Sequence, residues 1–295
     1  RKAAQYYLAL ARCNMRDGGS IYNLACCYGL MGEAELAAKF VERSVKAGFE
    51  DIGHISRDPD FESVRETDIF KETLERLQAE KKAEDSKKGK LALLEGSVYQ
   101  KCYIQLPDDY DPVKSYTLLV GLHGYGGRPG NFIKLWDRFA EHDFVFASLQ
   151  APYSFSAGSD TGYSWITGLP DDEEFWKQVS TASQDYVAGA IGQLCREYNI
   201  GSVYLLGFSQ GCTLAYLTGI HHHDIIDGII CFAGWLETDL LTDDDLDAAS
   251  RLRVFIAHGI HDRMVQLEAS YKARDTLLEH DYTVTLCEFD GAHHV

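Results

Sequence analysis

The chain has 295 residues, of which 45% are hydrophobic and 25% charged, as in a globular protein with more than one domain. No apolar run approaches the ~18 residues that a membrane-spanning helix needs, and no signal-peptide pattern opens the chain. The formal net charge is −17, and residues 98–295 hold 28 Asp and Glu against 12 Lys and Arg. This acidity works against binding to nucleic acid or to anionic lipid surfaces.

The eight cysteines are better explained as small buried residues than as a disulfide framework. Several lie inside apolar runs, as Cys26 and Cys27 do between Ala25 and Tyr28. We therefore expect free thiols, a reducing compartment and a cytoplasmic location. The first residue is Arg1 and not methionine, so we also expect the N-terminus to be incomplete or processed.

Three helices are predicted near the start of the chain. The first covers residues 1–16 and ends at Asp17-Gly18-Gly19, the second covers 20–31 with Ser20 as its cap, and the third covers 33–47. The second and third are joined at Gly32, which predicts a helical hairpin.

This hairpin resembles a tetratricopeptide repeat, in which small residues stand where the two helices cross. The resemblance rests on Ile21, Leu24, Ala25, Tyr28, Gly32, Ala37 and Val41. An unrelated helical hairpin is the alternative, because the repeat pattern is degenerate. Such repeats bury a core only by stacking, so we expect further repeats before Arg1 or docking onto the next domain.

A composition change marks the predicted domain boundary. Residues 58–61 predict a turn and a helix start, and 68–78 predict a helix with Ile69, Phe70, Leu74 and Leu77 on its apolar face. Residues 80–90 are almost wholly polar and cannot bury a face, which indicates a frayed helix end or a linker. We predict a helical segment at 1–79, a charged linker at 80–95 and a second domain at 96–295.

In the second domain, strands alternate with helices. Strands are expected at 98–106, 116–122, 144–149, 202–206, 228–233, 253–257 and 283–289, with helices at 131–142, 176–198, after Ser209 and at 265–280. A long loop rich in Ser, Gly and aromatic residues is expected at 151–170. This order predicts an α/β fold with a doubly wound, mostly parallel sheet, whose chemistry lies at the carboxyl ends of the strands.

The motif Gly207-Phe208-Ser209-Gln210-Gly211 is the centre of this domain. An apolar strand precedes it and a helical pattern follows, which is the context of a nucleophile elbow. The glycines allow the strand and the helix to pack closely around Ser209. A serine hydroxyl is a weak nucleophile by itself, so this interpretation requires a histidine base and an acid.

Two later loops supply those groups. Asp262 follows the strand at 253–257 and would orient a histidine, while His293 follows the last strand and would accept the Ser209 proton. His294 is the alternative base, although the Gly-x-His spacing favours His293. In the loop at 122–127, the N–H of Tyr125 would complete an oxyanion hole together with the N–H of Gln210, which follows Ser209 in the elbow. We expect His123 in that loop to be structural.

Residues 96–295 resemble the α/β-hydrolase superfamily, in the branch of acyl-protein thioesterases and related carboxylesterases. The resemblance rests on His123-Gly124-x-Gly126, the elbow, His258-Gly259-x-x-Asp262-x-x-Val265 and Gly291-x-His293, with serine, acid and histidine in the order of that superfamily. The chain departs from the pattern at Cys212, at Val265-Gln266 and in ending at Val295, where a terminal helix is expected; a trimmed or disordered tail is our interpretation.

The expected function is hydrolysis of a carboxylic ester or thioester through an acyl-enzyme, with no cofactor and no metal. We expect Tyr163, Trp165 and Trp235 to contact the substrate, the first two by lining an acyl pocket from the loop at 151–170. The other interpretation is that these aromatic residues cover a neighbouring helix. Alternatives for the whole chain are a feruloyl-esterase or polyester-depolymerase activity, or a scaffold that binds a protein partner through the helical repeat.

Two clusters could be mistaken for metal sites. His221-His222-His223 stands at a predicted helix end, where adjacent side chains cannot all reach one ion, so we interpret it as a solvated terminus. Asp243-Asp244-Asp245 follows Thr242 and predicts a capped first helical turn, not a calcium loop.

Overall fold

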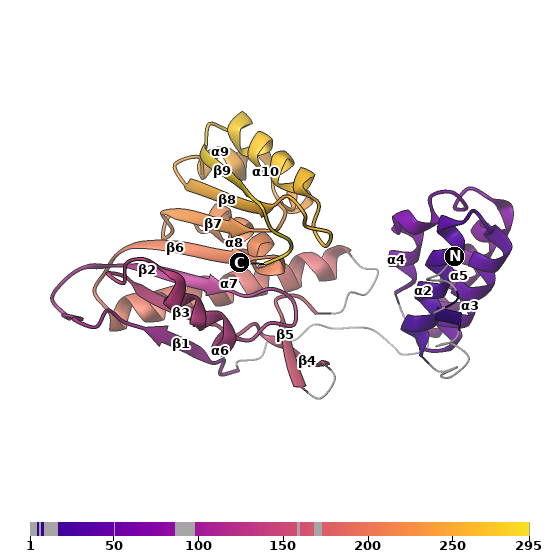
Figure 1. Cartoon of the computed structure of the whole chain (residues 1–295), viewed down its shortest axis with the longest axis horizontal. Coiled ribbons are helices and arrows are strands. Elements are labelled where there is room, and N and C mark those ends of the chain that lie inside the picture. The colour runs from indigo at the N-terminus through magenta and orange to yellow at the C-terminus, as the bar shows by residue number, and fades with distance from the viewer. Residues whose placement is uncertain are drawn as a thin grey trace. The chain divides into compact units, whose positions relative to one another are not determined.

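The computed structural model describes residues 5, 7–8, 17–49, 51–85, 98–157, 160–167 and 173–294 (Figure 1). The described residues up to Asp85 fall in one compact unit and those from Val98 in a second. Each unit is described by itself. The boundary expected within residues 80–95 remains a prediction, because residues 86–97 lie outside the described residues.

The first unit is helical. Its elements are α2 (Gly18–Leu30), α3 (Ala34–Lys46), α4 (Ile52–Arg57), the 3₁₀ helix η1 (Pro59–Phe61) and α5 (Asp68–Asp85). The predicted hairpin is confirmed, and its core contains Leu24, Val41 and Phe70. Its likeness to a tetratricopeptide repeat remains a prediction. The helix predicted at 1–16 lies outside the described residues except for Gln5, Tyr7 and Leu8, which are helical.

Three details of this unit differ from the prediction. The cap of α2 is Asp17, whose carboxylate accepts the Ser20 N–H, because glycines can occupy the first helical positions there. The short helix α4 was not predicted. Helix α5 continues past the predicted helix end at residue 78 to Asp85, into the segment interpreted as a frayed helix end or a linker, and the Arg76–Glu80 ion pair of 3.1 Å shows how a polar helix face is stabilised.

The second unit is built on a seven-stranded sheet with the order β1-β3-β2-β6-β7-β8-β9. The strands are β1 (Cys102–Gln105), β2 (Tyr116–Leu122), β3 (Val145–Leu149), β6 (Ile200–Phe208), β7 (Gly228–Phe232), β8 (Arg253–Gly259) and β9 (Thr283–Phe289). Among these described strands only β1 is antiparallel to its neighbour, so the predicted mostly parallel sheet is confirmed.

Helices cover both faces of this sheet, as Figure 1 shows. The helical elements are α6 (Pro129–Phe132), η2 (Ile133–Arg138), α7 (Glu173–Glu197), α8 (Gln210–His221), η3 (Thr238–Leu240), α9 (Asp243–Ala248) and α10 (Leu267–Glu279). Successive side chains of β2 alternate between the faces. Leu118 and Val120 join the core that contains residues of α7, α8 and α10, whereas Leu119 packs with Phe132 and Ile133.

Two predicted segments have a different structure. The helix expected at 131–142 is only α6 followed by η2, because Trp136 and Phe139 turn inward to stack edge-to-face on Phe144. The loop expected at 151–170 contains a hairpin of β4 (Tyr153–Ala157) and β5 (Asp160–Ser164). Residues 158–159 and 168–170 of that loop lie outside the described residues.

Other features of the described chain follow the prediction or add to it. Thr242 and Asp245 cap α9 reciprocally, as predicted for an acidic first turn. The described cysteines are free thiols. No described helix has both the length and the apolar character required to cross a bilayer.

Candidate active site

Ser209 stands in the sharp turn between β6 and α8. Its φ of 53° and ψ of −119° lie in a region that side-chain-bearing residues rarely adopt, and this strain lifts the hydroxyl above the strand tip. Glycine is required on both sides. A Cβ at Gly207 would overlap Cys212, and a Cβ at Gly211 would come within 2.7 Å of the His123 carbonyl oxygen. The Ser209 N–H donates to the Phe232 carbonyl at 2.9 Å, which holds the turn against β7.

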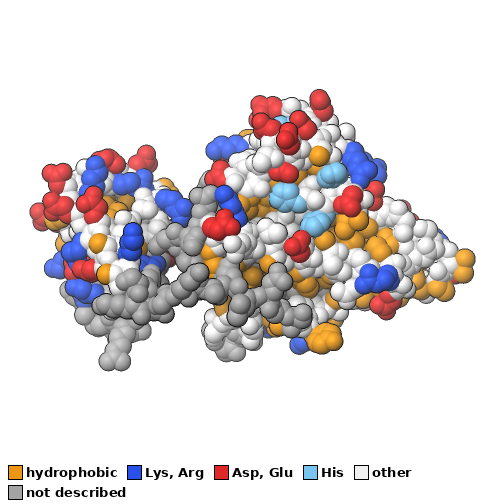
Figure 2. All heavy atoms as spheres, turned by 180° about the vertical axis from the view of Figure 1, so that it is seen from behind, with side chains coloured by type: hydrophobic (Ala, Val, Ile, Leu, Met, Phe, Trp, Pro, Cys, Tyr) orange, Lys and Arg blue, Asp and Glu red, His pale blue; other side chains and the backbone are white. Residues whose placement is uncertain are grey.

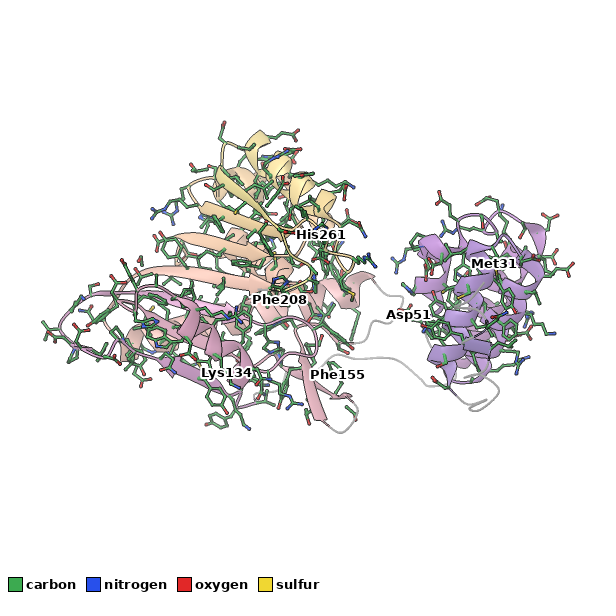
Figure 3. All side chains as sticks on the ribbon, viewed as in Figure 1. Met31, Asp51, Lys134, Phe155, Phe208 and His261 are labelled. Carbon is green, nitrogen blue, oxygen red and sulfur yellow. The ribbon has the colours of Figure 1, made fainter. Side chains whose placement is uncertain are left out.

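His293 connects Ser209 to Asp262. The His293 Nε2 lies 3.0 Å from the Ser209 Oγ, and its Nδ1 lies 2.7 Å from the Asp262 Oδ2. A carboxylate can only accept, so the Nδ1 carries the proton and the Nε2 has a lone pair for the serine hydroxyl. Phe208 packs against the imidazole at 4.9 Å between ring centroids, which restricts the rotation of the ring. Phe208 lies at the carboxyl end of β6 and His261 in the loop at the carboxyl end of β8; both are labelled in Figure 3.

Asp262 is buried but well supplied with hydrogen bonds. Its Oδ1 accepts the N–H groups of Met264 and Val265 at 2.8 and 3.0 Å. Burial alone would raise the pKa of Asp262, but the Val265 N–H, the His293 ring and the Met264 N–H together lower the pKa below its ordinary value. The carboxyl group is therefore ionised at neutral pH.

The loop after β2 lies against the elbow. A Cβ at Gly124 would be 3.3 Å from the Ser209 Cβ, so a larger residue there would crowd the nucleophile. The N–H groups of Gly126 and Gly127 donate to the carbonyl oxygens of Tyr163 and Gly124, both at 2.9 Å. Within the described residues, the N–H of Tyr125, which precedes these two glycines, has no backbone acceptor.

His123 has no nitrogen free for Ser209. Its Nδ1–H donates to the Gly124 carbonyl at 2.8 Å, and its Nε2 accepts the Ala151 N–H at 3.3 Å. Burial lowers the pKa of His123, which keeps this ring neutral. The structural role predicted for it agrees with these contacts.

The three predicted substrate-binding residues lie in different settings. Trp165 is 1% exposed, and its indole N–H donates to the His123 carbonyl at 2.7 Å. It also stacks on Tyr186 of α7, so the alternative interpretation of a side chain covering a helix describes Trp165 better than an acyl-pocket wall. Tyr163 is half-buried and packs against the core. Trp235 is 36% exposed on the loop after β7.

Gln210 joins the elbow to the end of β5. Its side-chain oxygen accepts the Trp165 N–H at 3.1 Å, and its amide nitrogen lies 3.0 Å from the Ser164 Oγ. The hairpin β4–β5 is further fixed to the loop after β2, because Phe155 stacks on Tyr125 at 4.7 Å. No local pattern in the sequence signals these contacts, since the residues are far apart along the chain.

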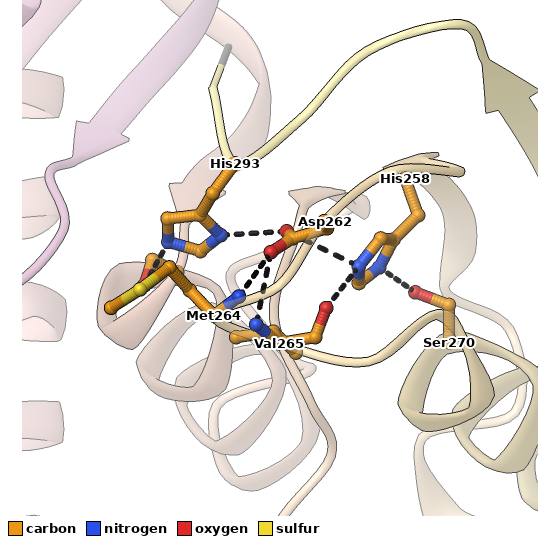
Figure 4. Close-up of polar contacts among 7 residues, drawn as sticks. His258, Asp262, Met264, Val265, Ser270 and His293 are labelled. Carbon is orange, nitrogen blue, oxygen red and sulfur yellow. Dashed lines mark hydrogen bonds and ion pairs between the residues drawn. The ribbon is translucent and has the colours of Figure 1, made fainter. Parts of the chain in front are cut away.

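Two further residues of the site were not predicted from the sequence. Phe208 contacts the imidazole of His293, and His258 contacts Asp262 from the side opposite His293 (Figure 4). Phe208 belongs to the elbow motif and His258 to the His-Gly-x-x-Asp motif. Neither motif predicts which side chains these residues contact. His293 and not His294 faces Ser209, while His294 packs on Phe289.

Among the described residues, three side chains of types that bind metals lie close together in the first unit. They are Cys26, Asp58 and Asp60. Asp58 already accepts the Tyr22 hydroxyl and the Asp60 N–H, so its oxygens have structural partners.

In the second unit, Figure 2 shows histidines gathered beside acidic side chains. The neighbours His221 and His222 face different groups, Gln184 at 2.6 Å and Asp185 at 3.5 Å, while the solvated helix terminus remains a prediction.

Comparison with known proteins identifies the second unit. Residues 111–295 match the family described as Phospholipase/Carboxylesterase. The Arabidopsis thaliana protein named "Probable carboxylesterase SOBER1-like" is 29% identical over 192 residues, which cover 59% of this chain and 69% of that protein.

Two solved structures share the fold. Esterase PE8 has a TM-score of 0.54 and 23% identity, and Zea mays acyl-protein thioesterase 2 has a TM-score of 0.53 and 16% identity. Each match covers 67% of this chain and 93% of the other. The chain therefore belongs to the phospholipase/carboxylesterase family of α/β-hydrolases and is a hydrolase of the esterase or thioesterase type.

Proposed function

We propose that the protein cleaves a carboxylic ester or thioester through an acyl-enzyme on Ser209, with His293 as the general base and Asp262 as the orienting acid. The observation that carries the proposal is the unbroken row of contacts from the Ser209 Oγ through both nitrogens of His293 to Asp262. Each atom in this row has the donor or acceptor character that nucleophilic catalysis requires.

In the first half-reaction, the His293 Nε2 takes the Ser209 proton as the Oγ attacks the carbonyl carbon of the substrate. The negative charge that develops on the carbonyl oxygen is accepted by hydrogen bonds from the N–H groups of Tyr125 and Gln210. The intermediate then expels the alkoxide or thiolate, which receives the proton from His293. Asp262 stabilises the imidazolium while it exists.

In the second half-reaction, water replaces the leaving group. His293 takes a proton from the water, and the resulting hydroxide attacks the acyl carbon. Collapse of the second tetrahedral intermediate breaks the bond to the Ser209 Oγ, and His293 returns the proton to that oxygen. A carboxylic acid leaves and the enzyme is restored.

The exposed side chains near the site favour an apolar acyl group. Tyr125, Trp235 and Met264 are 65%, 36% and 78% exposed, and each belongs to a loop at the carboxyl end of a sheet strand. Such side chains lose water contact when they cover an apolar chain. Binding of a protein partner by the helical unit and a cytoplasmic location remain predictions.

A fluorophosphonate probe tests the proposal, because it reacts covalently with an activated serine. We expect the wild-type protein to be labelled and to hydrolyse p-nitrophenyl esters, and Ser209→Ala to lose both properties. A scaffold with a degenerate hydrolase unit would show neither labelling nor turnover in the wild-type protein. Retained turnover in Ser209→Ala would show that another residue is the nucleophile.

A further inference from the structure

His258 is a buried histidine that the proposed reaction does not use. It lies on β8, four positions before Asp262, and is 0% exposed. Figure 4 shows its ring on one side of Asp262 and the His293 ring on the other. Both ring nitrogens have partners. The Nδ1 lies 2.6 Å from the Ser270 Oγ, and the Nε2 lies 3.0 Å from the Val265 carbonyl oxygen and 3.4 Å from the Asp262 Oδ2.

The partners of His258 determine where its proton lies. A carbonyl oxygen can only accept, so the Nε2 carries the hydrogen and directs it between Val265 and Asp262. In this tautomer the Nδ1 accepts a hydrogen bond from the hydroxyl of Ser270, a residue of α10 that is itself buried. The ring is held by contacts to two separate elements, and its orientation is fixed.

The turn that carries Asp262 is held through the same contacts. Val265 donates its N–H to the Asp262 Oδ1 at 3.0 Å and offers its carbonyl to His258. The Oδ2 of Asp262 has His293 at 2.7 Å on one side and His258 at 3.4 Å on the other. Without His258, the Val265 carbonyl oxygen and the Asp262 Oδ2 would each lose an N–H donor.

We propose that His258 is a positioning residue for the hydrolytic reaction, which holds the Asp262 carboxylate in line with His293 through the Nε2–H and the Val265 carbonyl. This inference rests on the proposed roles of Ser209, His293 and Asp262. Small displacements of a catalytic group are costly, since a shift of about 1 Å can lower a rate by about 100-fold.

A histidine that only stabilised the fold would also be buried and hydrogen-bonded, so the test needs readouts that a stability change does not move. His258→Leu removes both ring nitrogens, whereas His258→Gln keeps an N–H donor at about the reach of the Nε2. His261→Gln is the matched control, because this histidine of the loop after β8 is exposed and pairs with Asp290 at 2.9 Å.

The measurements are kcat and KM for p-nitrophenyl acetate across pH, the rate of fluorophosphonate labelling, and the melting temperature. For folded His258→Leu, we expect kcat to fall about 10- to 100-fold with KM within about twofold. The acid limb of the kcat/KM profile should move to lower pH, because a misaligned Asp262 stabilises the imidazolium less. Labelling should slow by a similar factor. His258→Gln should recover most of kcat, and His261→Gln should match the wild-type protein.

An unchanged kcat and an unchanged pH profile in folded His258→Leu would overturn the proposal. If that variant does not fold, Ser270→Ala decides, since it removes only the hydroxyl that fixes the Nδ1; a kcat and profile equal to wild type would likewise overturn it. Failure of the proposed function is distinguished by Ser209→Ala, which would then retain turnover while the His258 variants report on another reaction.

Discussion

Replacing Asp262 by asparagine reverses the donor and acceptor character of one side of the site while it keeps the shape of the side chain. All four contacts around the carboxylate come from N–H groups: the backbone of Met264 and Val265 on the Oδ1 side, and the rings of His293 and His258 on the Oδ2 side. The backbone N–H groups cannot change. The asparagine oxygen must stay with them, so its NH₂ group faces the two histidines.

An NH₂ group next to the His293 Nδ1 requires an acceptor there. The ring therefore shifts its proton to the Nε2, which then points a hydrogen at the Ser209 Oγ, 3.0 Å away, and can no longer accept the serine proton. Loss of the working tautomer costs about 10⁴-fold in kcat in the triad of a serine protease. We therefore expect a fall of ~10³–10⁴-fold, or about 4–5.5 kcal/mol at about 1.36 kcal/mol per tenfold.

The assay is steady-state hydrolysis of p-nitrophenyl acetate by Asp262→Asn, with circular dichroism and melting temperature as checks that the variant is folded. KM should change little, because Asp262 is buried behind His293 and has no path to the substrate. A folded Asp262→Asn variant whose kcat falls by less than about tenfold would refute the tautomer argument.

The remaining predictions concern the nucleophile, the pH dependence and the tryptophans. Ser209→Ala should abolish turnover and leave the melting temperature near that of the wild-type protein, and retained activity would contradict the elbow assignment. Activity should rise with pH around neutrality, where histidine titrates; the lowered pKa of Asp262 keeps protonation of that carboxyl below this range, and a flat profile with chemistry rate-limiting would exclude His293 as the base. Trp165→Ala should destabilise the protein by ~3–5 kcal/mol and lower kcat/KM equally for short and long acyl chains, because the ring is buried. Trp235→Ala should change the relative kcat/KM of short and long acyl esters by ~1–3 kcal/mol, and an equal loss for both would remove Trp235 from the acyl site.

The sequence by itself predicts the features that depend on neighbours in the chain. The elbow is recognised from an apolar strand, two glycines and a helical pattern within a short stretch, because strand, turn and helix are local structures. The same local patterns predict that Asp262 and His293 follow strand ends, and a parallel sheet brings the carboxyl ends of its strands to one edge. The fold class and the order of the reactive residues follow from these local patterns.

Only the tertiary structure decided which side chains touch. The sequence offers His293 and His294 as adjacent alternatives, and the difference lies in the direction of each side chain after β9. Burial of Trp165 depends on His123 and on α7, which are distant in sequence, so its aromatic character and loop position alone suggest a pocket wall.

Contacts between distant residues also determine the secondary structure at 131–142 and the surroundings of His258. Periodicity predicts a helix at 131–142, but packing of Trp136 and Phe139 on Phe144 outweighs a weak helical preference. The motif around Asp262 contains His258, but it does not predict what His258 contacts. Those contacts are with Ser270 on α10 and with the turn at Val265. Hydrogen bonds between distant segments form only after the chain has folded, and no local pattern in the sequence records them.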